Sequence, residues 1–140
     1  MADPTMVDPT IPIPDRDSAP YWAALAEGRV EIQQCLDCGH WTWPPRPICS
    51  KCQGENLVWR EAQGTGEVHS WVRLHRPVFP RFKDLVPFDI VLVRLDEEPD
   101  ILIPGRLLSE VAVHQGMRVR AAPTKLADDV GEILWEAASA

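Results

Sequence analysis

Four cysteines are the residues of this chain whose types and spacing most clearly indicate chemistry. They form two C-x-x-C pairs, Cys35 with Cys38 and Cys49 with Cys52, and ten residues separate the pairs. A C-x-x-C turn directs two sulfurs to one point, and two such turns supply the four thiolates of a tetrahedral Zn²⁺ site. Because four protein ligands close the coordination shell, we expect this metal to stabilise the fold and not to catalyse.

Other roles for the cysteines fit the surrounding sequence less well. A rubredoxin-type iron site uses the same four ligands and would make the chain an electron carrier. A dithiol redox pair usually lies in a βαβ context, which the sequence does not predict. The first ten residues, MADPTMVDPT, lack the pattern of an export signal, so we expect a cytoplasmic protein without disulfides. His40 follows the first pair, and we expect it on the surface.

Beyond the cysteines, we find no recognisable catalytic set in the sequence. Metal binding would leave no free cysteine, and the nucleophile motif G-x-S-x-G is absent. Residues 64–67, GTGE, lack the lysine and the spacing of a phosphate-binding P-loop. Adjacent carboxylates at 97–98 and 128–129 lie in predicted turns, where solvation explains them. We therefore expect no catalytic residue in this chain.

The chain is acidic overall but carries one local group of cations. Its 14 Lys and Arg residues against 21 Asp and Glu residues give a formal net charge of −7. This balance argues against general binding to a nucleic-acid backbone. Residues 73–83 nevertheless contain no acid, and a basic loop on an acidic protein suggests a small anionic ligand. The basic side chains of this loop are Arg73, His75, Arg76, Arg81 and Lys83.

Two histidines precede and enter this basic loop. His69 and His75 are six residues apart on one predicted strand, so strand alternation would place them on one side, together with Trp71 and Arg73. That side would be either a binding surface or an ordinary solvent-exposed face.

The N-terminal segments are expected to position these groups with little structure of their own. Residues 1–17 contain four prolines and predict a flexible arm. Residues 18–28 predict a short helix that begins after Asp17 or Ser18 and ends at Gly28. Such a helix is too short to be stable alone and needs a surface to lie on, which is either this chain's own or a partner's.

The rest of the chain predicts β-strands. Residues 29–62 predict a zinc ribbon, in which the strands VEIQQC, HWTW and LVWREA alternate with the two cysteine turns. Residues 63–140 predict five short strands, and the turn-rich PTKLADDVG separates the last two. The expected fold class is therefore mainly β: an N-terminal helix, a rubredoxin-like zinc ribbon and a five-stranded OB-fold barrel, closed or partly open.

Four blocks of the sequence resemble the DUF35 family of zinc-ribbon and OB-fold proteins. They occur in the family's order over roughly residues 20–138, and they are YWAALAEGRVEIQQC, CLDCG with PPRPICSKC, GTGEVHSWVRLHRP, and PFDIVLVRLDEEPDILIPGRL. The resemblance implies an accessory subunit of a thiolase-superfamily complex in lipid or aromatic degradation, without a fused hydratase domain. It also implies a thiolase-fold partner that supplies the catalytic residues, and a heterotetramer because such partners dimerise.

The resemblance further implies two ligands, Zn²⁺ and the coenzyme A thioester of an acyl-CoA. The basic and aromatic side chains of the loop could meet the phosphates and the pantetheine arm of CoA, although they could equally form an exposed hairpin or a docking surface. The expected CoA-binding residues are His75, Arg76, Phe79, Arg81, Phe82 and Lys83. Large side chains of the helix and the ribbon connector are expected to face the partner or the ligand: Tyr21, Trp22, Trp41, Trp43 and Arg46.

A different class of function is also open. An OB-fold can bind single-stranded nucleic acid through aromatic stacking and a basic groove, which predicts salt-sensitive binding to oligonucleotides. The net charge and the four family blocks favour acyl-CoA over nucleic acid. No apolar run is long enough to span a bilayer, so a membrane partner is not expected. Thiolysis, condensation and retro-aldol cleavage all remain open for the partner, as do the acyl group and the pathway.

Overall fold

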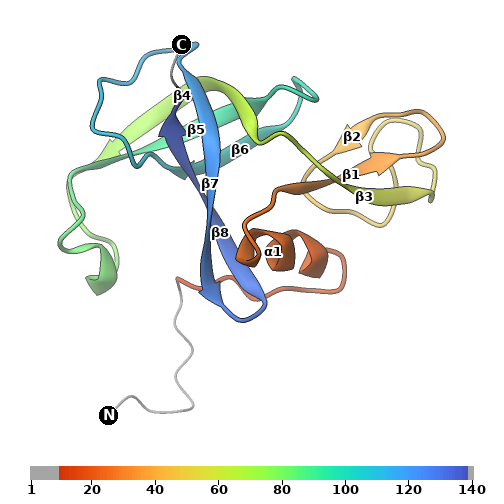
Figure 1. Ribbon diagram of the computed structural model, residues 1–140, viewed down its shortest axis with the longest axis horizontal. Helices are drawn as coiled ribbons and strands as arrows, with labels where there is room; N and C mark the ends of the chain where they lie inside the picture. The colour runs from red at the N-terminus through yellow and green to blue at the C-terminus, as the bar shows by residue number, and fades with distance from the viewer. Residues whose placement is uncertain (1–9, 139–140) are drawn as a thin grey trace.

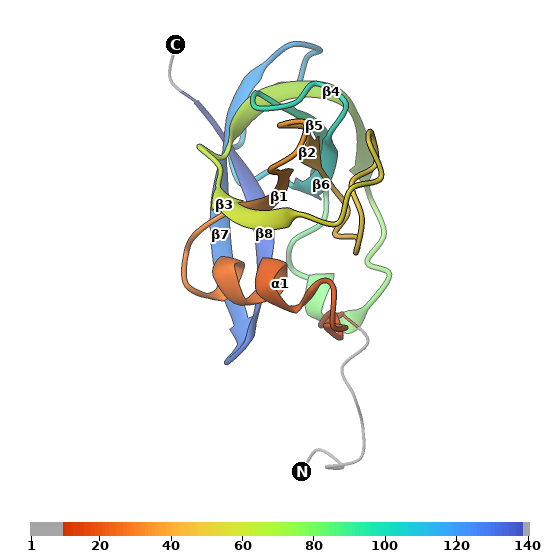
Figure 2. The same cartoon turned by 90° about the vertical axis from the view of Figure 1, so that its right-hand side faces the viewer.

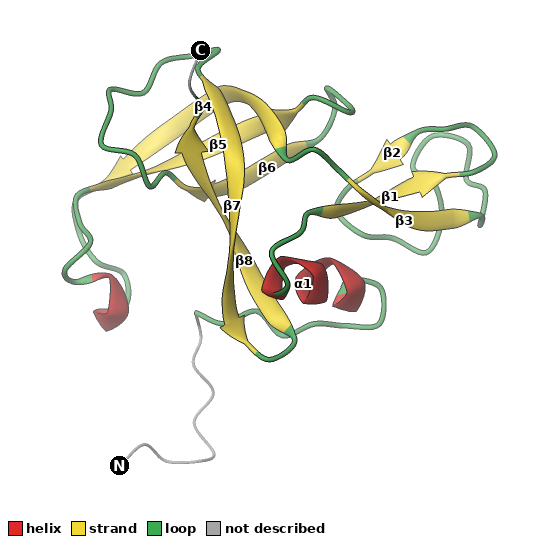
Figure 3. Cartoon of the chain, viewed as in Figure 1, coloured by secondary structure: helices red, strands yellow, loops and turns green. Residues whose placement is uncertain are grey.

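The computed structural model describes residues 10–138, which form one α-helix, a short 3₁₀ turn and two β-sheets (Figure 1). Most of the regular secondary structure is β-strand, as Figure 3 shows and as the sequence predicts. A flexible arm is expected at residues 1–17, and residues 1–9 of it lie outside the described part of the chain. The elements are α1 (Ala19–Ala26), β1 (Glu31–Cys35), β2 (Trp41–Thr42), β3 (Leu57–Glu61), β4 (Thr65–Leu74), η1 (Pro80–Phe82), β5 (Phe88–Leu95), β6 (Leu102–Arg106), β7 (Arg118–Ala127) and β8 (Val130–Ala137).

The smaller sheet is the predicted ribbon. Its strand order is β2-β1-β3, and both pairings are antiparallel, with Gln33 opposite Thr42 on one side and Trp59 on the other. The two cysteine turns project from one end of this sheet. Figure 1 shows the ribbon beside the larger sheet and connected to it through β3.

The larger sheet has the order β6-β5-β4-β7-β8, and all of its strand pairings are antiparallel. A single parallel bridge, Leu107 with Trp135, joins the two edges, so the barrel is OB-like but not fully closed. Every second residue of β5 is buried, which is the period expected for a strand with one face in the core. The buried core includes Val68, Val91, Val93, Leu95, Ile101, Ile103, Val119 and Trp135.

Strand β4 departs from the simple alternation that the sequence predicts. Val68 lies opposite Val93 but Ser70 lies opposite Leu92, so His69 is an extra residue in a β-bulge. One inserted residue reverses the side to which the following side chains point. Trp71 therefore shares the face of Val91, and the predicted common row of His69, Trp71, Arg73 and His75 is wrong. His75 also lies beyond the end of β4.

The last two strands form a longer hairpin than expected. β7 continues to Ala127 and β8 begins at Val130, so most of the segment predicted as a turn is strand. Helix α1 covers this hairpin, as Figure 2 shows. A Cβ atom added at Gly131 would lie 2.3 Å from the carbonyl carbon of Leu25, so helix and strand backbones touch. The helix thus packs on its own chain, and it covers the hairpin of β7 and β8.

Candidate functional site

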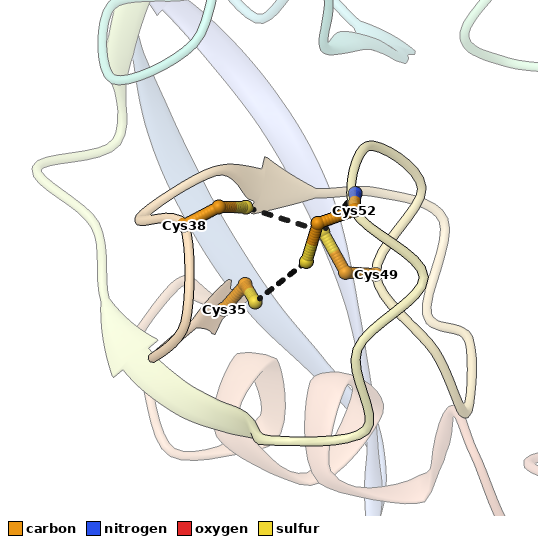
Figure 4. Close-up of side chains that lie close together, drawn as sticks. All are labelled: Cys35, Cys38, Cys49 and Cys52. Carbon is orange, nitrogen blue, oxygen red and sulfur yellow. Dashed lines mark hydrogen bonds between the residues drawn. The ribbon is translucent and has the colours of Figure 1, made fainter.

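The two cysteine turns bring four sulfur atoms together at the end of the ribbon (Figure 4). All four Sγ atoms lie within 4.8 Å of one another, with 3.5 Å between Cys35 and Cys52 and 3.6 Å between Cys38 and Cys49. A tetrahedral zinc ion with bonds of about 2.3 Å separates its sulfurs by about 3.8 Å, so the donor set fits such an ion. The structure therefore positions all four predicted ligands for metal binding.

Backbone conformation forms the two turns. Gly39 has a φ of +80° and Gln53 a φ of +64°, so Gln53, not its neighbour Gly54, takes the left-handed conformation of the second turn. Gly54 has a different role. A Cβ atom at this position would lie 2.6 Å from the Asp37 carboxylate and 3.3 Å from the Cys52 sulfur, so a side chain there would displace the Asp37 carboxylate.

Amide groups aimed at the sulfurs favour the charged form that a metal needs. The amides of Cys52 and Lys51 donate to the Cys49 sulfur at 3.5 Å and 3.3 Å. These hydrogen bonds, that of Cys52 first, lower the pKa of the Cys49 thiol to about 6. These amides thus favour the thiolate form of Cys49, and thiolate is the ligand form of cysteine.

His40 takes no part in the sulfur cluster and is not the surface residue that the sequence predicts. Its side chain is only 14% exposed, and its Nδ1 lies 3.3 Å from a carboxylate oxygen of Glu98. Glu98 belongs to the turn between β5 and β6, so this contact links the ribbon to the larger sheet.

The second feature is a cleft of about 640 Å³ on the larger sheet, which we call the aromatic cleft. It brings together two sets of side chains that the sequence predicts separately, from the helix and connector and from the basic loop. His75, Lys83, Trp41 and Arg46 are not among its lining residues. The predicted residues that line it are Tyr21, Trp22, Trp43, Arg76, Phe79, Arg81 and Phe82.

Aromatic rings in mutual contact form much of the wall. Tyr21 meets Trp22 edge-on at 5.0 Å between ring centroids and lies 6.1 Å from Trp43. Phe82 lies 5.9 Å from Phe88. Tyr21 is only 3% exposed, and burial raises the pKa of its phenol. Its ring belongs to the core of this chain, whereas the neighbouring Trp22 is half-buried. The docking role expected of Tyr21 stays a prediction.

The guanidinium groups of the cleft differ in their surroundings. Arg81 donates to the Thr10 hydroxyl at 3.1 Å, pairs with Glu132 at 3.5 Å and covers the Phe82 ring. Arg81 therefore ties the loop to β8 and to the N-terminal segment. Arg76 and Arg106 have no ion pair within residues 10–138, and Arg106 lies 5.9 Å from the centre of the Phe88 ring.

Sequence reasoning missed many of the lining residues of the cleft, among them Phe88, Ile90 and Arg106. Phe88 and Ile90 point to the opposite side of β5 from Val91, and Arg106 lies directly across from Ile90 on β6. The alternation of β5 could have placed the first two on a second, partly exposed face. The pairing of Ile90 with Arg106 could not be read from the sequence.

A smaller, polar cavity of about 470 Å³ lies between the ribbon and the larger sheet, and it holds the two remaining predicted docking residues, Trp41 and Arg46. The buried Gln33 side chain positions Arg46 by accepting from its N–H at 2.8 Å and donating to its carbonyl at 2.9 Å. The cavity is lined by His40, Trp41, Trp43, Arg46, Ser50, Lys51, Glu98, Asp100 and Ile101.

Across residues 10–138, no helix has the length and apolar character needed to cross a membrane.

Two family models match consecutive parts of the chain. A model described as "ChsH2, rubredoxin-like zinc ribbon domain" matches residues 22–58, and "ChsH2, C-terminal OB-fold domain" matches residues 59–123. The zinc-ribbon match and the four gathered sulfurs agree on the metal-binding character of the first part.

Proteins with similar sequences or structures include both subunits of enzymes and scaffold proteins. A "Probable enoyl-CoA hydratase alpha subunit" of Thermomonospora curvata is 36% identical over 61% of the chain, and the chain spans only 26% of that protein's length. A "DUF35 domain-containing scaffold protein" of Pyrococcus furiosus is 29% identical over 82% of the chain and 85% of the relative. A solved structure, "Ltp2-ChsH2(DUF35) aldolase", is 28% identical over 91% of this chain and 99% of that one, with a TM-score of 0.80.

Proposed function

Because the chain belongs to the ChsH2 (DUF35) family of proteins with a rubredoxin-like zinc ribbon and an OB-fold, we propose that it is the acyl-CoA-binding accessory subunit of a thiolase-superfamily complex. In this proposal, a thiolase-fold partner supplies the catalytic residues and performs thiolysis or retro-aldol cleavage. The relatives include a probable hydratase subunit, a scaffold protein and an aldolase, and these names support a role beside a catalytic chain.

The aromatic cleft is the observation that carries the proposal. It combines an apolar wall with the guanidinium groups of Arg76 and Arg106, which are free of ion pairs within residues 10–138. CoA offers phosphates for such cations and a long neutral arm for such a wall. Phe79 and Phe82 would contact the arm, and Arg81 would hold the loop in place. His75 and Lys83 would extend the cationic surface outside the cleft.

The four cysteines have a supporting role. They would hold Zn²⁺ in a closed shell, which crosslinks the two turns and supplies no reacting group. The ribbon in turn presents Trp41 and Arg46 beside the larger sheet, and Trp22 lies half-buried at the cleft. We propose these three residues as contacts for the catalytic subunit.

Co-expression with a thiolase-fold chain encoded nearby tests the proposal. We expect the two chains to co-purify as a heterotetramer, measured by light scattering, and to cleave a carbon–carbon bond of an acyl-CoA only together, measured by mass spectrometry of the products. Arg106→Met should weaken acyl-CoA binding at least severalfold. Arg120→Met, which removes a cation of β7 that is paired with Glu136 of β8, should not. Absence of both a complex and CoA binding contradicts the proposal, and salt-sensitive oligonucleotide binding would favour a nucleic-acid function instead.

A further inference from the structure

The segment that precedes helix α1 is attached to the rest of the fold at both of its ends. Next to the helix, the N–H of Ser18 donates to the Asp15 carboxylate at 2.8 Å, and the N–H of Asp15 donates to the Ser18 hydroxyl at 3.1 Å. Farther from the helix, Arg81 of η1 donates to the Thr10 hydroxyl at 3.1 Å. Figure 2 shows the beginning of the described chain next to η1. Residues 10–14 lie between these two attachments, and we call them the N-terminal strap.

The N-terminal strap forms part of the wall of the aromatic cleft. Pro12 is a lining residue of the cleft, together with Arg81 and Glu132. Ile13, the next residue after Pro12, is 79% exposed, so the strap has one side toward the cleft and another toward solvent. The proline rings at positions 12 and 14 fix φ and prevent a helix, which keeps such a short segment extended.

The two attachments of the strap differ in how firmly they hold it. The hydrogen bond between Arg81 and Thr10 is exposed, so water competes for both groups. The attachment at Asp15 consists of two hydrogen bonds within one turn, and it leads directly into α1, whose buried face is packed on β8. Arg81 also pairs with Glu132, so the basic loop keeps its place when Thr10 is released. The strap can therefore move away at Thr10 while it stays attached at Asp15.

We infer that the N-terminal strap is a gate of the aromatic cleft, which opens by swinging about Asp15 and is latched by the contact of Thr10 with Arg81. This inference goes beyond the proposed function, because it concerns how any ligand enters and leaves the cleft. The zinc-ribbon family model begins at residue 22, so the strap precedes both matched domains. The gate is thus formed by residues that the two family models do not cover.

Rates of ligand binding to the full chain test the inference. The probes are CoA and the apolar anionic dye anilinonaphthalene sulfonate, followed by stopped-flow fluorescence of the dye or of Trp22 and Trp43 in the cleft. Thr10→Val removes the latch hydroxyl and keeps the size of the side chain. It should accelerate association and dissociation alike, about fivefold each, the factor that corresponds to a hydrogen bond of about 1 kcal/mol. The affinity should therefore stay unchanged.

Three controls accompany this variant. Thr124→Val, which removes an exposed hydroxyl hydrogen bond on β7 outside the cleft, should change neither rate. Ile90→Trp, which narrows the cleft, should reduce binding of both probes and so assigns them to the cleft. Thermal unfolding and metal content of each variant establish that it is folded.

Every outcome decides the matter. Unchanged rates in Thr10→Val would overturn the inference, and CoA binding at those rates would leave the proposed function standing. Faster dissociation without faster association would make the strap a fixed wall, which also overturns the inference. If the dye but not CoA bound in the cleft, and its two rates rose together in Thr10→Val, the gate would stand and the proposed CoA site would fail. Absence of both probes from the cleft would overturn both proposals.

Discussion

The ribbon and the OB-fold part lie side by side in one chain of 140 residues, yet different forces hold them together. The ribbon has strands of two to five residues, and a short set of buried side chains that includes Ile32 and two of the cysteines. The OB-fold part supplies most of a continuous apolar core, which includes Val68 and Trp135 and also takes in Ile32 of the ribbon. The small ribbon therefore depends on a metal for much of its stability, whereas the larger OB-fold part is stabilised mainly by packing of its core.

This difference also separates the roles of the two parts. The sulfurs of the ribbon are gathered at one point. The other side chains of the ribbon position the connector between the two cysteine turns. The OB-fold part has enough core on one face of β5 to leave Phe88 and Ile90 on the other face for a cleft. The two parts interlock, because α1 precedes the ribbon in sequence but packs on β7 and β8.

Removing one metal ligand should have the largest effect. Cys49→Ser is expected to lose the metal and the ribbon fold, because binding of structural zinc contributes about 10–16 kcal/mol in small zinc domains. Metal analysis together with the fraction of soluble protein measures this. Ser50→Ala, at the exposed neighbouring position, is the control and should keep the metal. A folded Cys49→Ser protein without metal would show that the ribbon needs no metal, and would remove the contrast between the two parts.

A core truncation should affect the OB-fold part next most strongly. Leu95→Ala, at a residue that is 1% exposed, should lower the free energy of unfolding by about 2–5 kcal/mol. Urea denaturation measures the loss, and Val72→Ala, at a residue that is 60% exposed, should change little. We expect Leu95→Ala to retain its metal under native conditions. Loss of metal in this variant would mean that the ribbon depends on the OB-fold core.

Loss of the Gln33 side chain should weaken the connector of the ribbon. Gln33→Ala leaves the N–H and the carbonyl of Arg46 without their partners, at a cost of about 1–3 kcal/mol. Hydrogen exchange at the Arg46 amide should accelerate while the cysteine turns stay protected. Gln34→Ala, which removes an exposed hydrogen bond to Gly39, is the matched control. An unchanged exchange rate would show that the connector is held by other contacts.

The smallest effect is expected from a pH-dependent pair on the OB-fold part. The guanidinium of Arg118, at 2.9 Å, holds the pKa of the Asp96 carboxyl below its ordinary value of 3.8. The folded state then favours the ionised form, so the pair stabilises the protein above about pH 3.8 and this contribution is lost as pH falls through the lower folded pKa.

Asp96→Asn should accordingly reduce stability at pH 6 and have little effect near pH 2. The difference should stay below about 1 kcal/mol, because the pair is solvent-exposed. Urea midpoints at the two pH values measure it. An equal loss at both values would assign the effect to packing and not to charge.

The sequence could predict features that depend on near neighbours. The spacing of Cys35, Cys38, Cys49 and Cys52 predicts the metal site, because each C-x-x-C turn is a local structure. Helix α1 begins after Ser18 and ends before Gly28, at the predicted positions, although the Ser18 side chain makes no capping hydrogen bond. The strands of the ribbon and of β5 follow from their composition and alternation. The basic loop at 73–83 was also visible, and it does contribute Arg76 and Arg81 to the cleft.

Only the tertiary structure decided which of these features meet. The bulge at His69 reversed the side of Trp71, packing on β8 buried Tyr21, and strand pairing brought Arg106 beside Ile90. The physical reason is that a strand or a turn records the period of its own side chains, whereas the cleft depends on register and packing between residues far apart in the chain. The sequence by itself therefore determined the metal-binding turns and the classes of the elements, and the tertiary structure determined the cleft.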